Sequence, residues 1–168
     1  MHEARGLLLY SDPEIIRKRP ALNQWSAIEC VAHLNLSTQA MLPGIRQAID
    51  ASPEKNGNSA PYRMDFLGRL LAWSLEPPPY LKFKTTAIAQ PAETGEPQAL
   101  LEEFDRQHEE LLQLLHTASN RQIDTQKLKS PFGNVRYNTF SALRIVTAHD
   151  RRHLWQARRA VSPRRATK

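Results

Sequence analysis

The chain has 168 residues, of which 40% are hydrophobic and 24% charged, and its formal net charge is +6. This composition is ordinary for one globular domain with a hydrophobic core, and it excludes a low-complexity chain. No apolar run approaches the roughly 20 residues that a transmembrane helix needs, and the N-terminus lacks the long apolar segment of a secretory signal.

The N-terminal region predicts one short helix over about 13–19. Ser11 or Asp12 can cap this helix, a proline fits its first turn, and Pro20 ends it. A start nearer Glu3 is the alternative that the same residues allow. Either start leaves the first helix short.

The second predicted helix has the clearest signals. Ser26 followed by Glu29 is a capping box, so the helix begins just after Trp25 and runs to about Ile49. At 100° per residue its apolar side chains form one stripe that faces the core. This stripe consists of Val31, Leu34, Leu42, Ile45 and Ile49.

Three further helices are predicted over 63–75, Pro97–Ala118 and Thr139–Val161. Prolines at 77–79 end the first of them, and the stretch 119–138 is a connection that proline and glycine interrupt. No pair of alternating strands is evident, so we expect no β-sheet of consequence. The predicted fold class is all-α, a helical bundle with long connections.

The positive charge is concentrated at the C-terminal end. Seven of the 23 basic residues lie within 151–168, which contains no acidic residue, and the remaining 16 nearly balance the 17 acidic ones. A short basic end of this kind is usually solvated. We therefore expect one domain over 1–161, a disordered basic tail over 162–168, no nucleic-acid partner and no membrane partner.

His149 and His153 are four residues apart in the last predicted helix. This spacing places both imidazoles on one face, one turn apart, where they can chelate one metal ion. The same angular count places them in the inward apolar stripe and points the arginines of this helix to water. The alternative is a pair of histidines that hydrogen-bond to neighbours without a metal. The arginines are Arg144, Arg151, Arg152, Arg158 and Arg159.

A bundle can supply a third ligand from a facing helix, and His33 is the best candidate for it. This histidine lies at the edge of its helix's apolar stripe among small residues, which leave room for a cavity around the ring. A lone histidine in a helix is more often structural, so that alternative stays open. His108 and His116 are expected to be partly solvated and not to be ligands.

For other side chains near these histidines, the sequence leaves more than one role open. Cys30 is the only cysteine, which excludes an internal disulfide and fits a cytoplasmic location; it is a small buried side chain, a fourth ligand or a reactive thiol. Glu29 is a cap or a carboxylate that orients the imidazole one turn further on. Asp150 either approaches the site or supports another helix. We interpret Trp25 and Trp155 as core anchors.

Two segments resemble signatures of the DinB-like superfamily. Residues 25–34 are similar to the family pattern W-S-x-x-E-x-x-x-H-L, and residues 148–156 are similar to H-x-x-x-H-x-x-Q. The resemblance implies an antiparallel four-helix bundle of DinB type, a homodimer, and a metal site formed by His33, His149 and His153. The implied metal is zinc or nickel, with open positions filled by water. Relatives include bacillithiol S-transferases and mycothiol-dependent isomerases, which implies a low-molecular-weight thiol as a second cofactor.

Three neutral imidazoles leave a divalent metal its full charge and at least one exchangeable position, as in catalytic rather than structural zinc sites. Such a metal activates water for hydrolysis or holds a thiol as thiolate. We therefore expect a metal-dependent enzyme that transfers a low-molecular-weight thiol to a small electrophilic substrate, or hydrolyses that substrate. The alternative is a non-catalytic metal-binding or ligand-sensing bundle that acts through dimerisation.

Overall fold

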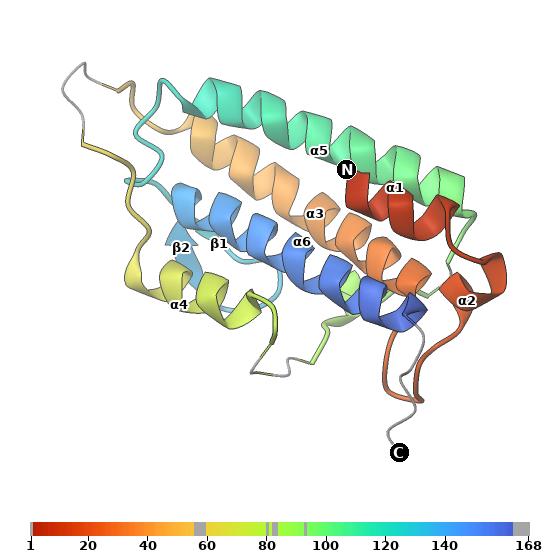
Figure 1. The fold of residues 1–168 in the computed structure, drawn as a ribbon. Coiled ribbons are helices and arrows are strands. Elements are labelled where there is room, and N and C mark those ends of the chain that lie inside the picture. The colour runs from red at the N-terminus through yellow and green to blue at the C-terminus, as the bar shows by residue number, and fades with distance from the viewer. Residues whose placement is uncertain (1, 56–59, 80, 82–83, 93, 163–168) are drawn as a thin grey trace.

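The computed structural model describes residues 2–55, 60–79, 81, 84–92 and 94–162, and these residues are mostly helical (Figure 1). This agrees with the predicted all-α class. Within the described residues, no helix is both long and apolar enough to span a bilayer. In chain order the elements are α1 (His2–Leu9), α2 (Pro13–Arg17), α3 (Ala27–Asp50), α4 (Phe66–Leu75), the 3-10 helix η1 (Ala87–Ala89), α5 (Pro97–Ala118), β1 (Lys127–Lys129), β2 (Arg136–Asn138) and α6 (Thr139–Val161).

The start of α3 confirms the predicted capping box. The Ser26 hydroxyl accepts a hydrogen bond from the Glu29 backbone N–H at 3.3 Å, and the Glu29 carboxylate accepts one from the Ser26 N–H at 2.9 Å. These bonds satisfy two of the N–H groups that the first turn of a helix leaves unpaired. The same carboxylate binds Arg19, which ties the preceding loop to the helix.

The N-terminal region forms two helices where one was predicted. Asp12 caps α2 by accepting from the Glu14 N–H at 2.8 Å, and α1 precedes it as a separate helix. Arg5 of α1 pairs with Asp105 of α5, and Glu3 pairs with Arg158 of α6. The alternative start near Glu3 therefore lies inside a helix of its own, which packs across α5 and α6.

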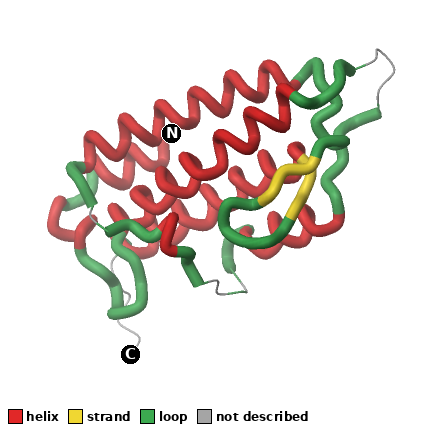
Figure 2. Tube along the Cα trace, turned by 180° about the vertical axis from the view of Figure 1, so that it is seen from behind, coloured by secondary structure: helices red, strands yellow, loops and turns green. Residues whose placement is uncertain are grey.

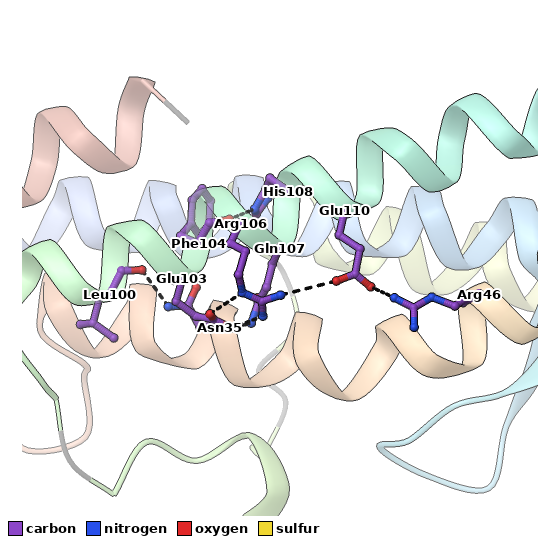
Figure 3. Close-up of polar contacts among 9 residues, drawn as sticks. All are labelled: Asn35, Arg46, Leu100, Glu103, Phe104, Arg106, Gln107, His108 and Glu110. Carbon is purple, nitrogen blue, oxygen red and sulfur yellow. Dashed lines mark hydrogen bonds and ion pairs between the residues drawn. The ribbon is translucent and has the colours of Figure 1, made fainter.

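The long helices do not all alternate in direction. Asn35 donates to the Leu100 carbonyl at 2.9 Å and Arg46 pairs with Glu110, so α3 and α5 run the same way (Figure 3). α6 runs opposite to both (Figure 1). The all-antiparallel arrangement expected from the sequence therefore does not describe α3 with α5. The connection 51–96, which contains α4, returns the chain to the end of the bundle where α3 begins.

The first turns of α4 and α6 share one carboxylate. Asp65 accepts hydrogen bonds from the Gly68 N–H, the Ser141 hydroxyl and the Asn138 N–H, each at 2.9 Å. Asn138 in turn caps α6 by accepting from the Ser141 N–H at 2.8 Å. Because one side chain serves both helix starts, α4 lies close along α6, with Gly68 directly against Ser141.

A short antiparallel hairpin, β1 with β2, occupies part of the stretch predicted as a connection (Figure 2). Leu128 and Tyr137 lie opposite each other in it, and both are buried. Their side chains belong to an apolar cluster that also includes Ile45 and Val146. A second cluster includes Leu154 of α6. The turn of α6 that carries the two predicted ligands therefore lies between two apolar regions.

His108 of α5 is partly buried, as expected, and bridges to α6 through Asp150, which is one of the two roles that the sequence left open for this carboxylate. Its Nδ1 lies 2.7 Å from the Phe104 carbonyl oxygen, and its Nε2 lies 3.1 Å from a carboxylate oxygen of Asp150. Burial lowers the pKa of His108, but the hydrogen bond and charge of Asp150, with the Phe104 carbonyl, raise it further than burial lowers it. Both ring nitrogens face acceptors, so the protonated ring fits this position.

We predict that Gly68→Ala destabilises the fold. A Cβ at this position would overlap the Ser141 Cβ and Oγ, so α4 and α6 would have to move apart. Overpacking of this kind costs about 1–3 kcal/mol, measurable as a lower midpoint of urea unfolding. Gly6→Ala in α1 is the matched control, because nothing lies within 4 Å of the added methyl group. Equal effects of the two substitutions would contradict the close approach of α4 and α6.

We predict that the stabilisation by His108 weakens as pH rises. Its pKa lies above 6.5 in the folded protein, so its contribution is complete below pH 6.5 and is lost through the folded-state pKa. His108→Gln should lower the free energy of unfolding by about 1.5–3 kcal/mol at low pH, the range for a hydrogen bond to a charged group, and by less at high pH. Urea unfolding of both proteins with a chelator present tests this. A difference that is constant or grows with pH would show that the charged bridge is absent.

Candidate metal centre

The structure brings together the three histidines that the sequence analysis proposed as ligands. His33 comes from α3, and His149 and His153 come from adjacent turns of α6. One ring nitrogen of each lies within 4.8 Å of those of the other two. The Nε2 atoms of His33 and His149 are 3.1 Å apart. Two nitrogens bound to one zinc ion at about 2.0–2.1 Å would be only slightly further apart, so the spacing suits a shared ion.

The position of the triad follows from the packing of α3 against α6. The four-residue spacing of His149 and His153 puts both rings on the side of α6 that faces α3, as predicted. His33 and His153 are buried, and His149 is partly exposed. The ring centroid of His33 lies 5.0 Å from that of His149 and 4.4 Å from that of His153. Solvent therefore reaches the cluster by way of His149.

A backbone carbonyl orients the His33 ring. Nδ1 of His33 lies 2.6 Å from the Ala89 carbonyl oxygen, so Nδ1–H is the donor and Nε2 keeps its lone pair, which faces the cluster. Metal-binding histidines commonly hold their second nitrogen in this way. The sequence analysis missed this contact, because a backbone acceptor in η1 has no side-chain signature.

All three imidazoles favour the neutral form. Burial lowers the pKa of His33 despite the Ala89 carbonyl. Burial, the neighbouring His33 and the charge of Arg152 lower the pKa of His149 to about 3. Burial and the charges of its neighbours also lower the pKa of His153 well below 6.5, while the nearby Gln156 side chain opposes the shift. Neutral rings have free lone pairs, so a cation would displace no protons at neutral pH.

The residues present fit a divalent metal ion. Nδ1 of His153 is buried and has no hydrogen-bond partner among the described residues. One ring nitrogen of each of the three histidines lies within 4.8 Å of the others, so one cation could be shared by all three. Three neutral imidazoles are also a ligand set that zinc and nickel accept.

Sequence similarity to known proteins identifies the family. A model of the DinB superfamily matches residues 2–157. The chain belongs to the DinB superfamily. The resemblance seen in segments 25–34 and 148–156 is thereby confirmed. Neither the curated proteins nor the solved structures contain a match to this chain.

Trp25 lies beside the triad in this DinB-superfamily protein. Its ring centroid is 4.5 Å from that of His33 and 5.7 Å from that of His153. The side chain is half-buried, so it forms part of the wall of the site. Trp155, the other predicted anchor, is also half-buried and stacks instead on the guanidinium of Arg159.

Arg152 corrects the prediction that the arginines of α6 face water. This side chain is buried and donates to the Ser74 carbonyl at 3.1 Å and the Leu81 carbonyl at 2.7 Å. The end of α4 and the segment after it pack on this face of α6. The angular position of a residue on its own helix does not show which other segments pack there, so the prediction missed this contact. The positive charge of Arg152 contributes to the lowered pKa values of His149 and His153.

The alternatives left open for other side chains now have structural answers. Cys30 is buried, burial raises its pKa to about 12, and it is not part of the histidine cluster, so the structure favours the small buried side chain over a ligand or reactive thiol. Glu29 serves the cap and Arg19. Asp150 supports α5 through His108.

Two surface hollows lie away from the triad. One, of about 530 Å³, is lined by residues of the loop between β1 and β2. The other, of about 610 Å³, lies over α5 and is lined mostly by charged side chains, among them Arg5, Arg46 and Glu109. Neither hollow is lined by a triad histidine. Because His33 and His153 are buried, access to the three rings depends on the partly exposed side of His149.

Proposed function

We propose that this DinB-superfamily protein binds one divalent metal ion, zinc or nickel, through His33, His149 and His153. We further propose that it is an enzyme that transfers a low-molecular-weight thiol to a small electrophilic substrate, or hydrolyses that substrate. The observation that carries the proposal is the convergence of three neutral imidazole nitrogens from two helices. In this proposal α1, α3, α5 and α6 form the four-helix bundle of DinB type.

The chain's residues prepare the site for this chemistry. When bound, a divalent ion would supply Lewis acidity, which lowers the pKa of a water or thiol bound to it. The three histidines add no negative charge, and three protein ligands leave room for an exchangeable ligand. The Ala89 carbonyl holds His33 in the tautomer whose Nε2 faces the cluster. The partly exposed edge of His149 is the side from which a small molecule would approach.

A metal-binding or ligand-sensing bundle without catalysis is the second candidate. It is favoured by one observation: two of the three rings, those of His33 and His153, are only 5% and 7% exposed, so protein surrounds them closely. A filled coordination sphere would stabilise the fold without turnover. The two candidates differ in whether a bound metal can accept an added thiol.

We predict that His149→Ala sharply reduces metal content. Removing one of three ligands leaves two, too few to hold zinc or nickel firmly, whereas His116→Ala should have no effect because His116 is exposed and outside the cluster. Metal analysis of both variants, purified without a nickel column and then loaded with zinc, makes the comparison. Full metal content in His149→Ala would end the three-histidine proposal.

A second measurement separates the two candidates. Protein loaded with Co²⁺ in place of zinc is mixed with 2-mercaptoethanol. A sulfur-to-cobalt charge-transfer band in the near ultraviolet is expected if an open position accepts a thiol. An unchanged spectrum would favour the non-catalytic bundle.

We also propose that the protein is a homodimer, with a second copy covering the exposed face of α4. Phe66, Leu70 and Trp73 are spaced i, i+4 and i+7 and are 79%, 46% and 59% exposed. Two α4 helices related by a two-fold axis between residues 69 and 70 would place Phe66 of one copy against Trp73 of the other. The same register brings Arg63 near Glu76. A stable interface buries about 800 Å² per partner. The three apolar side chains would therefore form only its centre, with neighbouring residues around them.

We predict a dimer mass by light scattering that Leu70→Glu reduces to a monomer mass. A charge at the centre of the contact would be buried without a partner. Leu112→Glu on α5 is the control, because Leu112 is similarly exposed at 53% but lies on another face. A monomeric wild-type protein refutes the dimer, and a dimeric Leu70→Glu variant refutes the assignment to α4.

We propose no nucleic-acid or membrane partner and a cytoplasmic location. Support comes from the arginines of α6, which make contacts within the chain: Arg151 pairs with Glu76, Arg158 pairs with Glu3, and Arg159 stacks on Trp155. The single buried thiol fits a reducing compartment. The division into a domain over 1–161 and a tail over 162–168 stays a prediction, since residues 163–168 lie outside the described residues.

A further inference from the structure

Trp25 contacts two of the three proposed ligands, which come from different helices. Its indole is tilted by 48° to the His33 ring at 4.5 Å and by 36° to the His153 ring at 5.7 Å. The centroids of these two imidazoles are themselves 4.4 Å apart, and their planes are inclined at 65°. The indole and the two imidazoles therefore form one continuous aromatic cluster that bridges α3 and α6.

The backbone around Trp25 is held firmly. Trp25 precedes the N-cap Ser26, and an apolar residue at this position usually packs on the fourth residue of the helix, here Cys30. The ring of Trp25 extends further, to His33 and across to α6. The capping box and the pairing of Arg19 with Glu29 fix the chain on both sides of it. The helix cap therefore fixes the backbone from which the indole extends.

Contact with an indole restricts how an imidazole can turn. A ligand ring that is held in place before the metal binds loses less conformational freedom on binding. Metal coordination also draws electron density from an imidazole, and a partly positive ring is a better neighbour for the negative face of an indole. Both effects favour the metal-bound state over the metal-free one.

We propose that Trp25 is a positioning residue of the metal centre, holding His33 and His153 in the orientation that one shared ion requires. The inference rests on the proposed metal site and adds to it a residue outside the ligand set. Trp155 offers the matched comparison. It is half-buried on α6 two residues from His153, but its described stacking partner is Arg159.

The test compares Trp25→Met, Trp25→Phe and Trp155→Met with the wild type. Metal-free proteins are titrated with Co²⁺, and affinity and the visible spectrum are recorded. Trp25→Met keeps an apolar side chain but loses the planar face, so we expect about 10–100-fold weaker binding, the range for groups that orient metal ligands, and an altered spectrum. Trp25→Phe should recover most of the affinity. Trp155→Met should match the wild type in both.

The unfolding temperature of each metal-free protein separates positioning from stability. If Trp25→Met lowers that temperature but keeps wild-type affinity and spectrum, Trp25 is structural only and the inference fails. If the wild type itself takes up no Co²⁺, or His149→Ala takes up as much, the metal site fails and the inference fails with it.

A third measurement does not depend on replacing Trp25. In a Trp73→Phe, Trp155→Phe background Trp25 is the only tryptophan, because the chain has three. Its fluorescence should fall as one equivalent of Co²⁺ binds. Unchanged fluorescence would place Trp25 away from the ion and overturn the inference even if Trp25→Met fails to fold.

Discussion

The packing of α3 against α6 is the interaction on which the site depends. These helices run in opposite directions, so the early part of α3 meets the later part of α6, and His33 lies opposite the turn that carries His149 and His153. Two apolar clusters hold the pair on either side of that turn. A shift of one residue along either helix would move a ring by about 1.5 Å and rotate it by 100°, which would separate the nitrogens.

The polar rings carry a cost within this interface. Burial lowers the pKa of each imidazole, and each keeps at least one nitrogen directed into the protein. The Ala89 carbonyl satisfies one nitrogen of His33, whereas Nδ1 of His153 has no partner among the described residues. Three buried or partly buried imidazoles brought together between two apolar regions stabilise the fold less than apolar side chains would, which favours a binding role for the cluster.

Local signals in the sequence predicted the helices and the two-helix origin of the site. The capping box at Ser26 and Glu29 and the spacing of His149 and His153 act over four residues, so they can be read without the fold. Contacts between distant segments could not be read in this way. The paths of the connecting segments decide which distant parts of the chain meet. They determine the parallel direction of α3 and α5, the hairpin, and the bridge from His108 to Asp150. Trp25 was expected in the core and instead packs on ligands from two helices.

The end of α4 and the segment that follows it contact α6 and α3 beside the triad. Arg152 binds the carbonyls of Ser74 and Leu81, and the Ala89 carbonyl binds His33. One donor is the neighbour of His153 and the other is a proposed ligand, so the conformation of this segment and the orientation of the rings depend on each other. Arg152 also places a positive charge near His149 and His153. That charge adds to burial in keeping both rings neutral, so their lone pairs stay free.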